Sequence, residues 1–220
     1  SQESHDRRSL SRRWMVALAA VALVIVVGLT LAAVIGPRLL GGTTPVTAMP
    51  PPRFVAEAET AGLDHVYDGE YEFFVGGGVA AFDCDDDGRQ DLYLAGGSRP
   101  AALFRNESPI GGELRFTRLA DPVTDLSSTT GAYPLDVDSD GVTDLAVLRR
   151  GENVLLRGLG DCRFERANEA WSFDGGNEWT TAFSATWEEG ATWPTLAFGN
   201  YVRDELTDPS NLCQDNALVR

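Results

Sequence analysis

The sequence contains no lysine and almost no histidine. All 18 basic residues are arginine, and the two histidines, His5 and His65, stand far apart in the chain. Neither histidine therefore suggests a metal site or a catalytic base. The motifs Gly-x-Ser-x-Gly and His-Glu-x-x-His are missing, as is any cluster of Cys and His. These absences argue against the common hydrolase and zinc-enzyme sites, and we expect the chain not to be an enzyme.

Positive charge is scarce in most of the chain. The formal net charge is −15, and from Phe54 to the C-terminus 31 acidic residues face 12 arginines, a net of −19. Binding of nucleic acid through its phosphates needs clustered positive charge, so no nucleic-acid partner is expected. A surface this acidic suits cations or cationic partners, or it serves solubility alone.

Charge is missing altogether from residues 14–36, which are almost entirely apolar. A helix of this length spans the roughly 30 Å hydrocarbon core of a bilayer, which predicts a transmembrane signal-anchor helix at 14–36. Four arginines precede the segment within residues 1–13. The positive-inside rule then places residues 1–13 in the cytoplasm and the bulk of this single-pass chain outside the cell. A cleaved signal peptide is the alternative, although the apolar run exceeds the usual length of roughly 7–15 residues.

Residues 37–53 are rich in Gly, Pro and Thr, with three consecutive prolines, and predict an extended linker. From Phe54 onward the pattern changes to short apolar runs separated by Gly, Asp, Asn or Pro. No amphipathic helical window of useful length occurs there. Residues 54–220 therefore predict an all-β domain built from hairpins.

The predicted hairpins repeat. One unit runs from Gly76 to Asp121 and a second from Thr129 to Ala170. Each contains a strand, an aspartate-rich loop, two further strands and a last strand of the form Arg-Phe-x-Arg. A third unit is expected from Thr195, with Gly199–Tyr201 in the place of Phe82–Cys84. Units of about four strands at this spacing predict the blades of an incomplete β-propeller, two with acidic loops and part of a third.

The two acidic loops, "DCDDDGRQD" (83–91, the first acidic loop) and "DVDSDGVTD" (136–144, the second acidic loop), share one spacing. Alternate carboxylates on a tight loop can turn toward one point, and Gly at position 6 permits the sharp reversal. The predicted metal ligands are the side chains at positions 1, 3, 5 and 9 and the carbonyl at position 7: Asp83, Asp85, Asp87, Arg89 and Asp91 in the first loop, and Asp136, Asp138, Asp140, Val142 and Asp144 in the second.

Hard oxygen ligands in a flexible loop favour Ca²⁺ over Zn²⁺ or Mg²⁺, and Ca²⁺ is plentiful outside the cell. The loops are not EF-hands, because position 12 is Leu94 or Val147 instead of a bidentate Glu. The alternative is that both are merely acidic surface turns. Their presence at equivalent places in two repeats favours calcium. In the third unit Asn200, Val202 and Asp204 are poor ligands, and no strong calcium site is expected there.

The pattern from Gly76 to Leu94, "GGGVAAFDCDDDGRQDLYL", followed by "LFRN", resembles the FG-GAP/VCBS repeats of integrin α-subunit propellers. It is most similar to bacterial proteins related to cartilage acidic protein 1 and the UnbV group. The stretch "FVAEAETAGLDHVYDG" (54–69) of this chain also resembles the segment that precedes the repeats in that group. The resemblance spans roughly residues 54–220. It implies a propeller of about seven blades, with structural Ca²⁺ between the first two strands of a blade. It also implies binding or adhesion more than chemistry.

Three cysteines lie in the predicted extracellular part, where disulfides can form. Cys162 and Cys213 are expected to pair because both fall in loops of adjacent units, with free buried thiols as the alternative. A stretch rich in aromatic residues follows the second unit. It favours packing between blades over a sugar-binding platform; its members are Trp171, Phe173, Trp179, Phe183, Trp187 and Trp193.

Two functions remain open from the sequence. The favoured one is a membrane-anchored, extracellular calcium-binding module that binds a protein or a glycan. The alternative is the non-catalytic propeller part of a larger exported enzyme. Since propellers typically need about 4–8 blades, we expect this chain to be a fragment of a longer protein.

Overall fold

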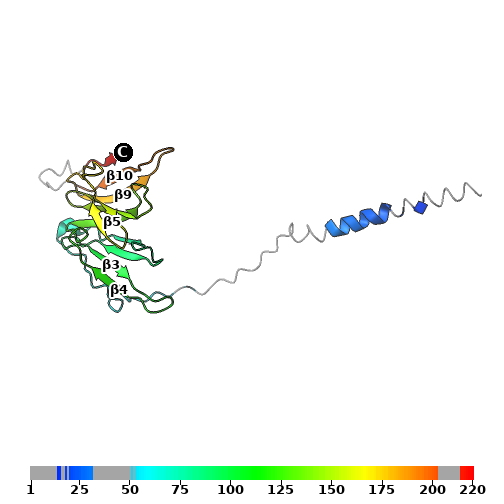
Figure 1. The fold of residues 1–220 in the computed structure, drawn as a ribbon, viewed down its shortest axis with the longest axis horizontal. Coiled ribbons are helices and arrows are strands. Elements are labelled where there is room, and N and C mark those ends of the chain that lie inside the picture. The colour runs from blue at the N-terminus through cyan, green and yellow to red at the C-terminus, as the bar shows by residue number, and fades with distance from the viewer. Residues whose placement is uncertain (1–13, 16–17, 19, 32–50, 52, 203–213) are drawn as a thin grey trace, which may run out of the picture. The chain divides into compact units, whose positions relative to one another are not determined.

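The computed structural model of the chain (Figure 1) describes residues 14–15, 18, 20–31, 51, 53–202 and 214–220. The chain divides into two compact units, Ser1–Phe54 and Val55–Arg220. In the first unit, residues 20–31 are α-helical with exposed side chains. Among the described positions, no helix is both long enough and apolar enough to cross a membrane. The predicted cytoplasmic segment 1–13 and nearly all of the linker 37–53 lie outside the described residues, as do parts of the predicted span 14–36.

The second unit consists mainly of antiparallel β-sheet and begins with a short 3-10 helix, η1 (Tyr71–Phe73). Two four-stranded sheets each follow chain order. Their strands are β1 (Val79–Phe82), β2 (Asp91–Leu94), β3 (Ala102–Asn106) and β4 (Phe116–Leu119) in sheet 1, and β5 (Thr129–Leu135), β6 (Asp144–Arg149), β7 (Val154–Gly158) and β8 (Phe164–Arg166) in sheet 2. Sheet 3 has the order β11-β10-β9 and contains β9 (Thr180–Thr186), β10 (Thr195–Asn200) and β11 (Ala217–Val219).

Sheet 2 lies between the other two, and its central strands β6 and β7 are buried on both faces. Successive side chains of a strand point to opposite faces, and the five residues at the start of β6 are all buried. Leu145 and Val147 belong to a core cluster with Phe82 and Tyr93 of sheet 1. Alternate residues of β6 belong to a second core cluster with sheet 3. This double burial explains why β6 reads as a continuous apolar run in the sequence.

The first strands of the three sheets are neighbours, since β1 contacts β5 and β5 contacts β9. Figure 1 shows β5 between β9 and β3. The all-β prediction is thus confirmed for the described part of residues 54–220, which form three antiparallel sheets. The described residues do not form a closed propeller.

The prediction for the third unit is wrong in its starting point. Thr195–Asn200 form β10, which is the second strand of sheet 3, and β9 precedes it. The connection between the first and second strands of sheet 3 is therefore residues 187–194. Gly199–Tyr201 lie instead at the end of the second strand and do not correspond to Phe82–Cys84. The error has a physical cause: in β9 only Thr180 is buried, the residues after it alternate between half-buried and exposed, and the strand shows no apolar run.

Candidate metal centres

Both acidic loops connect the first strand of a sheet to the second, and each is closed by the aspartate at position 1. The Asp83 carboxylate accepts the backbone N–H groups of Asp87 (3.2 Å) and Gly88 (2.7 Å). Asp136 repeats this in the second loop, accepting from positions 5 and 6 at 3.1 and 3.0 Å. Gly88 and Gly141 have φ values of 82° and 87°. Glycine adopts this left-handed conformation without steric cost, which explains its place at position 6.

The aspartate at position 9 is fully buried in both loops and fastens the loop to the third strand of its sheet. Asp91 accepts the backbone N–H of Cys84 (2.9 Å) and that of Asn106 at the end of β3 (2.8 Å). Asp144 accepts the N–H groups of Val137 (2.7 Å) and Gly158 (2.8 Å) in the same way. Each carboxylate thus satisfies two backbone donors and ties three chain segments together.

Burial dominates the ionisation of these two carboxylates. It raises the pKa of Asp144 to about 6, even though the two N–H donors lower it, and the charges of Asp138 and Asp140 raise it further. Burial also raises the pKa of Asp91. A nearby cation would oppose both effects, because it favours the charged form of a carboxylate.

The structure brings together three of the predicted ligand side chains in each loop. Carboxylate oxygens of positions 1, 3 and 9 all lie within 4.8 Å of one another, and they belong to Asp83, Asp85 and Asp91 in the first loop and to Asp136, Asp138 and Asp144 in the second. In the first loop, Oδ1 of Asp85 is buried and has no hydrogen-bond partner within the described chain. A buried, unpartnered carboxylate oxygen beside two further carboxylates is a position that a cation would stabilise.

Position 5 lies outside these two groups. Asp87 accepts the N–H of Arg89 at 2.9 Å and forms an ion pair with the Arg89 side chain. Asp140 accepts the N–H of Val142 at 2.9 Å, and this bond chiefly lowers the pKa of Asp140. The position 5 carboxylates and the position 7 carbonyls therefore remain predicted ligands.

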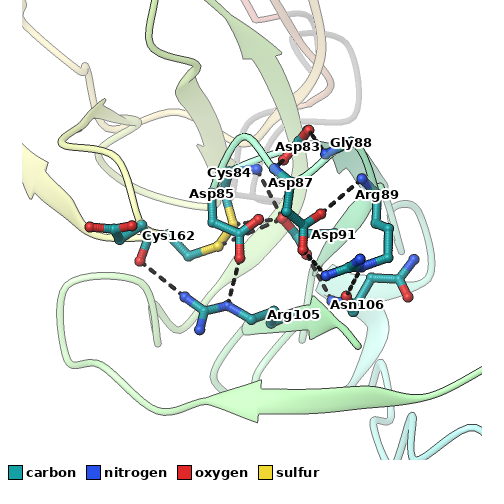
Figure 2. Close-up of a disulfide and its surroundings, with 11 residues drawn as sticks. Asp83, Cys84, Asp85, Asp87, Gly88, Arg89, Asp91, Arg105, Asn106 and Cys162 are labelled. Carbon is teal, nitrogen blue, oxygen red and sulfur yellow. Dashed lines mark hydrogen bonds and ion pairs between the residues drawn. A yellow bond between two sulfur atoms is a disulfide. The ribbon is translucent and has the colours of Figure 1, made fainter. Parts of the chain in front are cut away.

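Two arginines that the sequence does not mark as site residues form ion pairs with the candidate ligand carboxylates. Arg105 of β3 lies with Nε 3.1 Å from Oδ2 of Asp85, as Figure 2 shows. Arg157 of β7 lies 2.8 Å from Asp138 through Nε and 2.9 Å from Asp140 through a terminal nitrogen. The bond to Asp140 is the main cause that raises the pKa of Arg157. Their sequence signal is the arginine that recurs near the end of the third strand.

The first loop is cross-linked to sheet 2 by a disulfide between Cys84 and Cys162, whose Cα atoms lie 4.6 Å apart (Figure 2). The expected pair Cys162–Cys213 is therefore wrong. The backbone N–H of Cys162 also donates to the Cys84 carbonyl at 2.9 Å, and Arg105 donates to the carbonyl of Asp161 at 3.2 Å. Position 2 of the loop faces the neighbouring sheet, which the sequence spacing alone does not reveal.

The disulfide lies against the candidate metal ligands. Oδ2 of Asp91 is 2.9 Å from Sγ of Cys84 and 3.6 Å from Sγ of Cys162. Oxidised sulfur carries no hydrogen, so these contacts are not hydrogen bonds. The cluster of Cys84, Asp91 and Cys162 is consequently no thiolate metal site in this state.

The aromatic residues that follow sheet 2 divide between core and surface. Trp179 and Phe173 are buried, whereas Trp187 and Trp193 are nearly half exposed. Trp171 and Trp193 contact edge to face and border a cavity of about 360 Å³ between sheets 2 and 3. Trp171 and Phe183 are half-buried and pack against the second core cluster. The preference for packing thus holds for these two and the buried pair, whereas Trp187 and Trp193 remain largely at the surface.

Comparison with known protein families finds an FG-GAP-like repeat at residues 83–147. The matched segment begins with the first acidic loop and ends within β6, just after the second, so it contains both candidate metal centres. It covers under a third of the chain. No curated protein matches the sequence.

Proposed function

We propose that the β-sheet unit is a calcium-stabilised binding module, held outside the cell by the apolar segment 14–36. The observation that carries the calcium assignment is a repeated one. Two consecutive sheets place carboxylates from positions 1, 3 and 9 of a loop within 4.8 Å of one another, at the same place between first and second strands. Both loops thus offer a cation the same set of three carboxylates.

The chemistry of the ligands favours Ca²⁺ in this proposal. All candidate ligands are oxygens, and the carboxylates come from a loop instead of rigid strands, which suits the variable coordination of Ca²⁺. Bound Ca²⁺ would offset the repulsion among the carboxylates of each loop. The disulfide beside the first loop agrees with an oxidising compartment outside the cytoplasm. In this proposal the module binds an extracellular protein or glycan and does not catalyse a reaction.

Thermal unfolding of the full chain in 10 mM Ca²⁺ and in EGTA tests the calcium assignment. Two sites filled near saturation would raise the unfolding midpoint by about 5–10 °C. The double variant Asp85→Ala with Asp138→Ala is expected to lose this shift, because it removes the position 3 carboxylate from both loops.

A matched control is the double variant Asp64→Ala with Glu113→Ala, which removes the same charge from exposed positions outside the loops. It is expected to keep the full calcium shift. Equal shifts in the two double variants would contradict the ligand assignment. A wild-type chain with the same midpoint in Ca²⁺ and in EGTA would contradict calcium binding itself.

A further inference from the structure

Each of the three sheets carries an arginine at or beside the C-terminal end of its third strand. Arg105 in β3 and Arg157 in β7 follow two apolar core residues, and Arg220 follows two apolar residues of β11. Arg105 forms an ion pair with Asp85 at 3.1 Å, and Arg157 forms one with Asp138 at 2.8 Å. In both cases the carboxylate comes from the acidic loop between the first two strands.

Sheet 3 has the arginine and lacks the acidic loop. Its connection at residues 187–194 contains Glu188 and Glu189 and lacks the alternating aspartates. Arg220 donates to the Glu188 carboxylate at 2.6 Å. Within the described chain, the groups of three carboxylates that could hold an ion lie in the first and second acidic loops only. The ion pair between third strand and connection therefore forms in sheet 3 without a candidate metal centre beside it.

In the two acidic loops the arginine binds the same carboxylates that a cation would need. Arg157 contacts the carboxylates at positions 3 and 5 of the second loop, Asp138 and Asp140. In the first loop two arginines make these contacts: Arg105 pairs with position 3 and Arg89 with position 5. Without a metal ion, a guanidinium at this distance offsets the mutual repulsion of the carboxylates. With an ion bound, the two positive charges repel each other across a few ångströms. Both effects make the free energy of calcium binding less favourable.

We propose that Arg105 and Arg157 are built-in counter-cations, which hold the acidic loops closed in the ion-free protein and weaken their affinity for Ca²⁺. This inference rests on the calcium function proposed above. Extracellular modules typically bind Ca²⁺ in the weak range of about 10⁻⁴–10⁻³ M, and the arginines shift the affinity of these loops in that direction. Such sites fill outside the cell and stay empty where calcium is scarce, while the arginines keep the loops folded.

The test replaces Arg157 by Met in the full chain, which keeps the length of the side chain and removes its charge. Calorimetric titration with CaCl₂ is expected to show about tenfold tighter binding at one of the two sites. The unfolding midpoint in calcium-free buffer is expected to fall. Arg157→Lys, which keeps the charge, should bind Ca²⁺ within about threefold of the wild type. If Arg157→Met does not fold, Arg157→Gln takes its place with the same expected direction.

Arg166→Met is the control, because Arg166 lies on the neighbouring strand β8 and pairs with Glu152, outside the loops. Its calcium affinity should equal that of the wild type. If the wild type binds Ca²⁺ and Arg157→Met binds it equally or more weakly, the counter-cation inference is overturned and the calcium function stands. If only Arg157→Met binds, the inference is supported and the calcium function of the wild type is overturned. If neither binds, both are overturned.

Discussion

The two acidic loops share most of their internal hydrogen bonds and have different surroundings. Only in the second loop does the N–H at position 5 also donate to the position 3 carboxylate, at 3.3 Å. In both, the aspartate at position 1 closes the turn and the buried aspartate at position 9 binds the third strand. They differ at positions 2, 4, 7 and 8. Position 2 is Cys84 in the first loop and Val137 in the second, and position 7 is Arg89 in the first and Val142 in the second. The comparison shows which positions make the turn and which attach it to neighbouring sheets. Positions 1, 6 and 9 form the loop, both loops share the candidate ligand aspartates at positions 3 and 5, and positions 2, 4, 7 and 8 vary.

The largest difference between the loops is the disulfide, and its removal should have the largest effect. Replacing Cys84 and Cys162 by Ala removes a link between residues 78 positions apart. The chain-entropy model then predicts a loss of about 4.5 kcal/mol in the free energy of unfolding. Urea unfolding under non-reducing conditions measures this loss.

Cys213→Ala is the control for this pair, because it leaves the Cys84–Cys162 bond intact. It should unfold at the urea concentration of the wild type. Peptide mapping without reductant should find Cys84 linked to Cys162. A peptide that links Cys162 to Cys213 instead would contradict the disulfide and, with it, the attachment of the first loop to sheet 2.

The second difference concerns the pKa of the buried aspartate at position 9, and it predicts that the free energy of unfolding depends on pH. The pKa of Asp144 is raised from 3.8 to about 6 by burial, so the folded chain holds this proton more tightly than the unfolded chain does. Its protonation therefore contributes stability below about pH 4, and this contribution is lost as the pH rises through 6. In protein stripped of divalent ions, the free energy of unfolding should fall by up to about 3 kcal/mol between pH 4 and pH 6.

Urea unfolding at several pH values, with wild type and Asp144→Asn, checks this prediction. The asparagine variant should show a flatter pH profile because the titrating group is gone. Calcium should oppose the fall, since an ion favours the charged carboxylate. A profile equally steep in Asp144→Asn would show that another group causes the dependence.

The smallest difference lies at the end of the third strand, where Asn106 in the first loop's sheet corresponds to Gly158 in the second. A Cβ atom on Gly158 would clash with the carbonyl oxygen of Thr143. Gly158→Ala should therefore cost about 2 kcal/mol of stability. Asn106→Ala should cost about 1 kcal/mol, because it loses two partly exposed side-chain bonds, one donated to the carbonyl of Gln90 and one accepted from the N–H of Ser108, both at 3.0 Å. Chemical unfolding of both variants gives the two values, and the reverse order would contradict the close packing at Gly158.

The features that could be predicted from the sequence are the local ones. Strand runs such as Asp144–Arg149 and the spacing of the acidic loops depend on residues close in the chain, and the structure shows strands and turns there. The convergence of positions 1, 3 and 9 follows from the same local spacing.

The features that the sequence did not yield depend on packing between sheets. The disulfide requires position 2 of the first loop to face the connection after β7, and this placement exists only once sheets 1 and 2 have packed. The start of sheet 3 was missed because β9 becomes a strand by pairing with β10. The ion pair between Arg157 and Asp138 likewise joins β7 to the loop between β5 and β6, and these segments are adjacent only in the folded sheet.

The most direct test of the account is a crystal structure of the full chain grown with saturating Ca²⁺ and measured for anomalous scattering. We predict one anomalous peak in each acidic loop, about 2.4 Å from carboxylate oxygens of positions 1, 3 and 9. Loops without a peak, with Asp85 and Asp138 bound only by Arg105 and Arg157, would show that the arginines alone neutralise these carboxylates and would contradict the calcium sites.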